Sequence, residues 1–184
     1  MGLIFRKMRS EDLDVVKSID KIAFPNPWPE NAIKYELEEN SNARLWVAEL
    51  VEGNEKKLVA FAVIWVILDE AHIGTIAVHP DFQGNSIARR LLAVICLNLI
   101  DENINRLFLE VRKSNVAAIK LYEKFGFEVD GERKKYYRDN GEAALLMSCF
   151  LKSKIYYEEI FAKVADPISR SEERRVGKEC RSRW

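Results

Sequence analysis

The residues whose types and spacing most suggest chemistry lie between 76 and 92. There, a predicted strand runs into a loop of small residues, and a predicted helix begins with two arginines. Because a helix N-terminus presents unpaired backbone N–H groups and a partial positive charge, this arrangement can bind phosphate. The small residues Gly84, Ser86 and Ala88 would let a pyrophosphate approach the backbone. The two arginines are Arg89 and Arg90. An ordinary strand-to-helix connection fits the same spacing equally well.

Two side chains further along the chain could move protons. Glu110 lies between Leu109 and Val111 in an alternating segment, so a strand there would turn its carboxylate away from the apolar layer. Tyr122 lies in a predicted helix that Asn115 can cap. The alternatives are an outward charge on a strand for Glu110 and an aromatic ring packed on a sheet for Tyr122.

The elements that would position these residues alternate along the chain. Ser10 is expected to cap the first helix and Pro29 to begin the second, while Gly126 ends the fourth. Apolar periodicity predicts helices at 11–23, 30–39, 87–101, 116–125 and 154–164, and strands at 3–8, 44–51, 57–68, 72–78, 106–112, 127–132 and 143–151. The predicted order is a meander of strands, then strand, helix, strand, helix, strand, and a final hairpin. This order indicates a mixed α/β fold.

Charge and hydropathy exclude several classes of protein. The chain has 184 residues, with 29 Lys and Arg balancing 29 Asp and Glu, so composition favours neither nucleic-acid nor membrane binding. The longest apolar run, 59–68, is about half the length of a membrane-spanning helix. Charge appears too early at the N-terminus for a signal peptide. We therefore expect a cytoplasmic protein without membrane or direct nucleic-acid contacts.

The cysteines and histidines are too scattered to form a disulfide framework or a metal site. Cys96, Cys149 and Cys180 lie far apart and include no C-x-x-C motif. His72 and His79 have no cysteine partners at ligand spacing. We expect no metal and a reducing environment.

The phosphate-binding segment is similar to the cofactor loop of the GNAT N-acetyltransferases, Q/R-x-x-G-x-G/A, which is matched by Gln83, Ser86 and Ala88. The segment 109–127, LEVRKSNVAAIKLYEKFGF, closely resembles a motif of the RimI and archaeal Ard1 branch of that family. The segment 134–147 resembles the C-terminal hairpin of the same branch. Ser86 departs from the family glycine, which tolerates positive φ, although a serine hydroxyl could donate to a phosphate oxygen.

The resemblance implies a GNAT fold, with a mixed, mostly antiparallel sheet of about seven strands, a splayed parallel pair and flanking helices. It also implies acetyl-CoA as cofactor and coenzyme A as product. The residues expected to bind the cofactor are Ile76, Ala77, Val78, Gln83, Gly84, Asn85, Ser86, Ile87, Ala88, Arg89, Asn115 and Tyr122. Within this set the backbone of 76–78 would contact the oxyanion and the pantetheine. Glu110 would be the general base, acting through water, and Tyr122 the general acid.

The favoured acceptor is the free α-amine of a peptide or protein. The resemblance to the RimI branch suggests a ribosomal protein as this acceptor. Near pH 7 a chain terminus costs about 1 kcal/mol to deprotonate, whereas a lysine costs about 4–5 kcal/mol. By resemblance, aromatic and proline residues flank the peptide: Phe24, Pro25, Trp28, Tyr136 and Tyr137. Aromatic packing beneath loops is the alternative for these rings. The alternative functions are acetylation of lysine or of a small-molecule amine, and a non-catalytic CoA-binding regulatory module suggested by Ser86.

The chain is expected to divide into a catalytic domain at 1–152, a C-terminal helix at 153–168 and a charged tail at 169–184. Within the tail, residues 170–184 carry six basic and three acidic side chains without an amphipathic pattern. This segment has two interpretations, an appended extension foreign to the protein or a basic partner-binding tail. The sequence predicts no oligomeric state.

Overall fold

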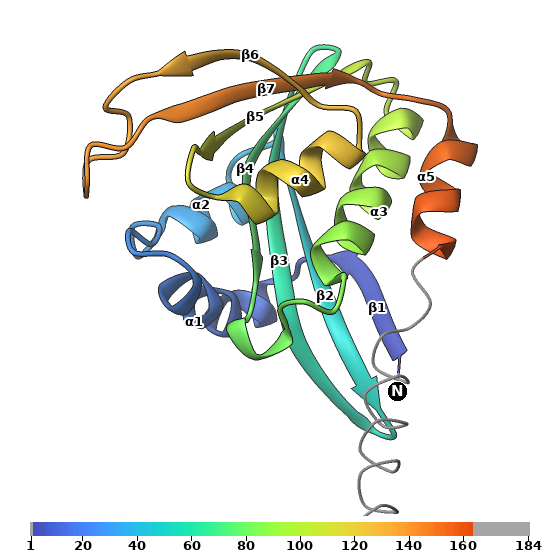
Figure 1. Cartoon of the computed structure of the whole chain (residues 1–184). Coiled ribbons are helices and arrows are strands. Elements are labelled where there is room, and N and C mark those ends of the chain that lie inside the picture. Colours follow the sequence, from blue (N-terminus) through green and yellow to red (C-terminus); the bar gives the residue numbers. More distant parts are fainter. Residues whose placement is uncertain (1, 164–184) are drawn as a thin grey trace, which may run out of the picture.

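A seven-stranded sheet organises the chain, and helices cover both of its faces (Figure 1). This computed structural model describes residues 2–163. In space the strands follow the order β1-β2-β3-β4-β5-β7-β6. The strands are β1 (Gly2–Lys7), β2 (Ala43–Glu52), β3 (Glu55–Ile67), β4 (Glu70–Val78), β5 (Arg106–Arg112), β6 (Glu128–Arg133) and β7 (Ala144–Phe150).

The helices divide between the two faces of the sheet. One face carries α1 (Leu13–Ala23) and α2 (Ala32–Glu38). The other face carries α3 (Ile87–Asp101), α4 (Val116–Lys124) and α5 (Lys154–Ala162). Two short 3-10 turns, Ser10–Asp12 and Pro80–Phe82, precede α1 and α3.

The central strand β3 explains why the sheet has two cores. Residues 59–64 form an unbroken apolar run, and every one of them is fully buried. Because successive side chains of a strand point to opposite faces, Phe61 and Val63 enter the core beneath α1 and α2. Ala62 and Ile64 enter the core beneath α3 and α4. Burial on both faces is the reason that the segment lacks the alternation of a half-exposed strand.

Helix α5 packs against both the first strand and the end of α4. The Phe161 ring lies 5.8 Å from the Phe5 ring, edge to face, and 4.7 Å from the guanidinium carbon of Arg90. The Tyr156 hydroxyl donates to the backbone carbonyl of Lys124 at 2.8 Å. The helix therefore supports the C-terminal end of α4 from outside the sheet.

The parallel neighbours β4 and β5 pair over only a few residues. Their ladder runs from Glu70 opposite Arg106 to Ile73 opposite Leu109. Beyond that point β4 continues to Val78 while β5 continues to its own end, so the two strands separate. All other neighbouring strands in the described sheet are antiparallel. The splay is accompanied by an irregularity in the β3–β4 register between Val63 and Ile64.

Two predicted helix starts are wrong. Ser10 does not cap α1, because it lies in a 3-10 turn in which the Asp12 carboxylate accepts the backbone N–H of Arg9 at 2.7 Å. Asp12 also pairs with Arg6 of β1, and these two contacts of its carboxylate hold the turn that precedes α1. Pro29 does not begin α2, which starts at Ala32 after a turn.

The predicted mixed, mostly antiparallel sheet with a splayed parallel pair is confirmed. The end of the predicted C-terminal helix and the charged tail at 169–184 lie outside the described residues, and the domain boundary after 152 stays a prediction. Cys96 and Cys149 are free and buried. Within residues 2–163, no helix is long and apolar enough to cross a bilayer, and no group of three or more His, Cys, Asp or Glu is placed to hold a metal ion.

We expect Phe125→Ala to lower the free energy of unfolding by about 3–5 kcal/mol, the usual cost of deleting a core aromatic ring. Phe125 is fully buried at the end of α4 and stacks on Tyr157 of α5, with centroids 6.0 Å apart. Urea denaturation measures the change. Phe150→Ala is the control, because Phe150 is 71% exposed and its loss should cost less than about 1 kcal/mol. Equal effects of the two substitutions would contradict this packing.

Candidate active site

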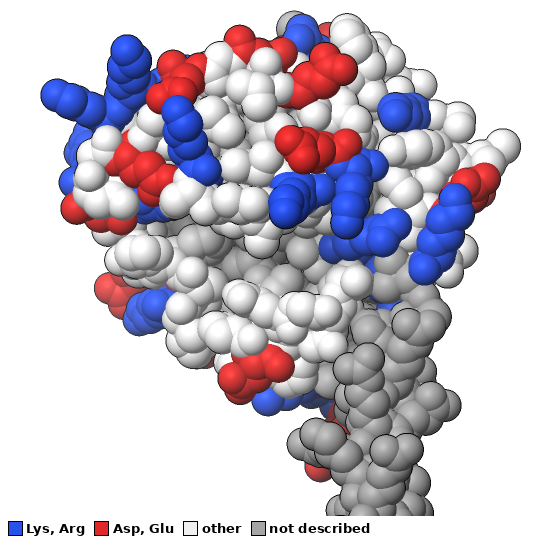
Figure 2. All heavy atoms as spheres, in the orientation of Figure 1, with Lys and Arg blue, Asp and Glu red and all other residues white. Residues whose placement is uncertain are grey.

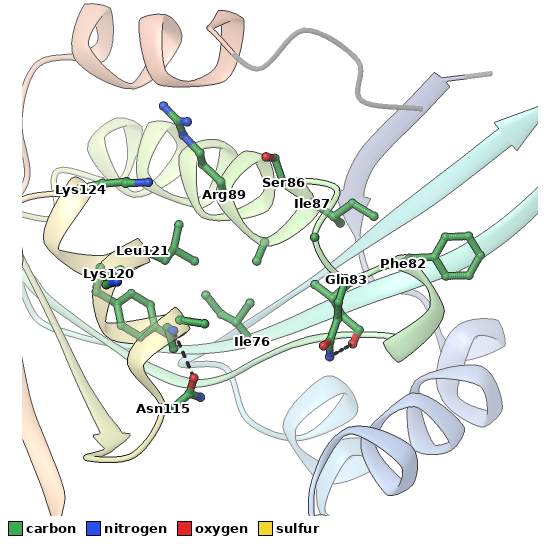
Figure 3. Close-up of a pocket in the computed structure, with 16 residues that line it drawn as sticks. Ile76, Phe82, Gln83, Ser86, Ile87, Arg89, Asn115, Lys120, Leu121 and Lys124 are labelled. Atoms are coloured by element: carbon green, nitrogen blue, oxygen red, sulfur yellow. Dashed lines mark hydrogen bonds between the residues drawn. The ribbon is translucent and has the colours of Figure 1, made fainter. Parts of the chain in front are cut away.

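A groove of about 450 Å³ lies where the end of β4 meets the N-terminus of α3 and one side of α4 (Figure 3). We call it the α4 groove. It brings together many of the residues predicted to bind the cofactor: Ile76, Val78, Gln83, Gly84, Ser86, Ile87, Ala88, Arg89, Asn115 and Tyr122. It also contains residues that the sequence analysis missed: Phe82, Ala117, Ala118, Lys120, Leu121 and Lys124.

Two residues predicted to bind the cofactor do not line this groove. The side chain of Ala77 is buried in the core beneath α1 and α2. The side-chain amide of Asn85 donates to the backbone carbonyls of Phe82 and Gln83, at 3.1 and 3.3 Å. The Ala77 side chain packs into the core and the Asn85 side chain ties the loop to itself.

The loop before α3 has the backbone conformation expected of a phosphate-binding turn. Gly84 and Ser86 both have positive φ, +78° and +56°. The left-handed conformation of Ser86 explains why glycine suits this position, since a non-glycine residue there costs about 1–3 kcal/mol. The Gln83 side chain fixes the loop to β4 by donating to the Val78 carbonyl at 3.1 Å. The start of α3 therefore faces the groove with its first-turn N–H groups.

Basic side chains gather at the mouth of the α4 groove. Arg89 comes from the first turn of α3, and Lys120 and Lys124 come from successive turns of α4. Figure 2 shows Lys and Arg side chains concentrated over this part of the molecule. The two lysines are four residues apart and so lie on one side of the helix, a spacing that is visible in the sequence. The groove has the small-residue backbone and the positive charge that a pyrophosphate ligand requires.

The separation of β4 from β5 leaves backbone groups of β4 facing the groove. The His79 N–H donates to Val59 of β3 at 2.8 Å. Because peptide groups alternate in direction along a strand, Ala77 also faces β3, whereas Ile76 and Val78 face the gap. The Val78 carbonyl is taken by Gln83. Past the end of the parallel ladder, the N–H of Ile76 points into the space between the strands.

A second groove, of about 720 Å³, crosses the sheet beside Tyr136 and Tyr137, and we call it the tyrosine groove. Glu110 lines it, turned away from Leu109 and Val111 as predicted. One carboxylate oxygen of Glu110 accepts from the Arg133 guanidinium at 2.7 Å. A hydrogen bond to Glu110 is the main cause that raises the pKa of Tyr136. The carboxylate is thus oriented by two partners while it faces open space.

Tyr122 is buried in the wall of the α4 groove. Its side chain is 8% exposed and packs on Phe127, with centroids 5.5 Å apart. Burial, assisted by the nearby Tyr137, raises the pKa of Tyr122 to about 12. The phenol therefore stays neutral and can donate a hydrogen bond over the whole physiological pH range.

The loop after α1 contacts Trp65, one of the residues that line the tyrosine groove. Trp28 donates from its backbone to Asp20 at 2.7 Å and from its indole to Thr75 at 2.9 Å. Its ring lies 6.0 Å from the ring of Trp65, which lines the groove. Phe24 packs against the core beneath α1 and α2, and Pro25 is exposed. A role for this loop in peptide binding stays a prediction.

The two grooves approach each other from opposite faces of the sheet. Ile76 and Val78 line the α4 groove, and Ile73 and Gly74, just before them on β4, line the tyrosine groove. The grooves are therefore adjacent where β4 leaves β5. A ligand in one could react there with a ligand in the other.

Residues 13–127 match the model of the acetyltransferase (GNAT) family. The chain belongs to the GNAT family. It is accordingly an acetyl-CoA-dependent N-acetyltransferase. A Bacillus subtilis relative is 39% identical over 142 residues, covering 77% of this chain and 91% of the relative. The [ribosomal protein bS18]-alanine N-acetyltransferase of Escherichia coli K12 is 36% identical over 143 residues, covering 77% of this chain and 93% of its own.

Solved structures agree with this membership. The crystal structure of the ribosomal-protein-S18-alanine N-acetyltransferase from Escherichia coli has a TM-score of 0.74 and 32% identity, covering 83% of this GNAT chain and 96% of the other. Ard1 from Thermoplasma volcanium shares the fold, with a TM-score of 0.72 at 23% identity and coverage of 83% and 100%. The predicted relationship to RimI is confirmed, and the Ard1 structure shows the same fold.

We expect the free energy of unfolding of Tyr122→Phe to fall less at alkaline pH than that of the wild type. The folded pKa of about 12 lies above the unfolded value of about 10, so the folded state loses stability as pH rises through this interval. From about pH 9 to about pH 11, the wild type should lose about 1.4 kcal/mol more than the variant. Urea denaturation at both pH values measures the difference. The control, Tyr35→Phe, removes the hydroxyl of a tyrosine that is 59% exposed and should follow the wild type. If Tyr122→Phe also follows the wild type, the burial argument fails.

Proposed function

We propose that this protein transfers the acetyl group of acetyl-CoA to the free α-amine of a protein N-terminus. One observation carries the proposal: Glu110 lines the tyrosine groove at the point where β4 and β5 begin to separate. A base at that position can serve an amine on one face of the sheet while the acetyl donor occupies the other.

The α4 groove suits acetyl-CoA in shape and charge. The N–H groups at the start of α3 would hold the pyrophosphate, supported by Arg89, Lys120 and Lys124. Asn115 lines the same groove, although its side-chain oxygen already accepts the Ala118 N–H at 3.1 Å, so a ligand would take its amide N–H groups. Bound acetyl-CoA supplies a thioester carbonyl as acetyl donor and a thiolate as leaving group.

Backbone and side-chain groups at the splay would then serve the reaction. The N–H of Ile76 would donate to the carbonyl oxygen as negative charge develops on it. Glu110 would remove a proton from the ammonium, directly or through one water. Because an α-amine costs about 1 kcal/mol to deprotonate near pH 7 and a lysine about 4–5 kcal/mol, a solvated carboxylate favours the α-amine.

Tyr122 would assist the departing sulfur. Its pKa of about 12 exceeds that of an ordinary thiol, about 8.5, so complete proton transfer would cost about 5 kcal/mol. A hydrogen bond that strengthens as the carbon–sulfur bond breaks needs no complete transfer. We therefore propose that Tyr122 donates a hydrogen bond to the sulfur and that a proton from solvent completes the step.

The acceptor is proposed by analogy with the relatives whose names state it. The E. coli relative acts on the alanine of ribosomal protein bS18. We propose a similar acceptor here, the N-terminus of a ribosomal protein, which would place the reaction in the cytoplasm. Tyr136 and Tyr137, which line the tyrosine groove beside Glu110, would contact the first residues of that chain.

Incubation with acetyl-CoA and short peptides tests the proposal. We expect free-terminus peptides to gain one acetyl group by mass spectrometry and α-blocked peptides containing lysine to gain none. Glu110→Gln should lower kcat by about 10²–10⁴-fold, the usual contribution of a general base. Glu128→Gln, on the exposed strand β6, is the matched control and should leave kcat unchanged. Acetylation of the lysine peptides alone would refute the α-amine proposal, and CoA binding without any turnover would favour a binding module.

We expect Lys124→Ala to weaken CoA binding about two- to fivefold at low salt, the usual effect of one exposed charge pair. The effect should shrink as salt rises, because exposed charges are screened. Isothermal titration with CoA at two salt concentrations measures both. Lys34→Ala removes one positive charge from α2, on the opposite face of the sheet, and should bind CoA like the wild type. Equal losses in the two variants would exclude a specific contact.

A further inference from the structure

The tyrosine groove has a wall made by one tryptophan resting on one glycine. A Cβ atom added to Gly74 would lie 2.7 and 2.8 Å from two ring carbons of Trp65, closer than real contacts allow. The indole therefore occupies the space that a side chain at position 74 would need. Both residues line the tyrosine groove together with Glu110.

Trp65 is fixed in this position by its neighbours. Its indole N–H donates to the Glu36 carboxylate of α2 at 2.7 Å, a charge-assisted hydrogen bond. The same carboxylate oxygen accepts the Asn40 side chain at 2.7 Å, so Glu36 is itself held. The Trp28 ring lies 6.0 Å away, and Trp28 is anchored through two hydrogen bonds of its own. The ring of Trp65 is thus a rigid wall.

This wall stands at the level of the reacting amine. Gly74 directly follows Ile73, the last residue of β4 that pairs with β5, and Glu110 directly follows its partner Leu109. Gly74 and Glu110 therefore lie side by side at the point where the strands separate. An amine within reach of Glu110 brings its own α-carbon to the same level, and the Trp65 ring then bounds the space for the first side chain on the β3 side.

We propose that Trp65 limits the acceptor to proteins whose first residue is small, such as glycine, alanine or serine. This inference rests on the proposed function and assigns the residue that sets the size limit of the same site. A leucine or methionine side chain would have to displace an indole that a hydrogen bond and a second ring hold in place. The adjacent glycine adds no side chain of its own, so the indole alone sets the limit on this side.

The test compares two peptides that differ only in the first residue, alanine or leucine. For Trp65→Ala we expect the ratio of kcat/KM, leucine over alanine, to rise at least about tenfold, the scale on which a pocket discriminates by size. The ratio is insensitive to partial loss of folded enzyme, because both peptides are measured on one preparation. Phe150→Ala is the control, since it removes an aromatic ring that is 71% exposed and does not line the groove, and its ratio should stay at the wild-type value.

A second pair of variants tests the support of the ring. Glu36→Ala removes the acceptor of the indole N–H and should raise the same ratio, while Glu36→Gln keeps an acceptor oxygen and should restore the wild-type ratio. A purely structural role for Glu36 would lower kcat/KM for both peptides equally and leave the ratio unchanged.

The outcomes separate the two proposals. If the wild type acetylates alanine and leucine peptides equally well, or if Trp65→Ala acetylates them in the wild-type ratio, the size limit is overturned and the proposed function stands. If the wild type acetylates no free-terminus peptide, the proposed function is wrong and the size limit falls with it.

Discussion

The short parallel ladder between β4 and β5 is the constraint on which the site depends. Four residue pairs join the two strands, and the ladder stops at Ile73 and Leu109. Backbone groups cannot be left unpaired inside a sheet without a replacement partner, so the gap beyond that point must be filled by something other than the neighbouring strand. On β4 it is filled in part by Gln83, which takes the Val78 carbonyl, and in part by the ligand that we propose.

In the reaction that we propose, the sheet separates the two reactants except at the gap between β4 and β5. Helices α3 and α4 and the loop before α3 form the groove on one face. Helices α1 and α2 cover only part of the other face, where residues of β3 to β7 and the two tyrosines form the second groove. Glu110 faces the second groove because strand alternation puts it opposite Leu109 and Val111. The alternation of side chains along β5 thus puts the proposed base on the face opposite the proposed cofactor groove.

Much of this could be predicted from the sequence, because the signals are local. The loop at 83–88, the Asn115 cap and the outward direction of Glu110 each depend on residues a few positions apart. The wall formed by Trp65 and Gly74 has no such signal, since it joins two strands and depends on the irregular register between Val63 and Ile64. The start of α1 differs from the prediction for a related reason, because Asp12 is held by Arg6 of the first strand.

Helix α5 extends the influence of the α4 groove to the end of the described chain. Tyr156 holds the last carbonyl of α4 at Lys124, and Phe161 reaches Phe5 of the first strand. A ligand that binds only the folded state adds about 2.7 kcal/mol of stability at a hundred times its dissociation constant. Through Lys124 and α5, that linkage would reach both ends of the described residues, so bound cofactor would lower the fraction of molecules in which β1 and α5 are frayed, although neither element lines the groove.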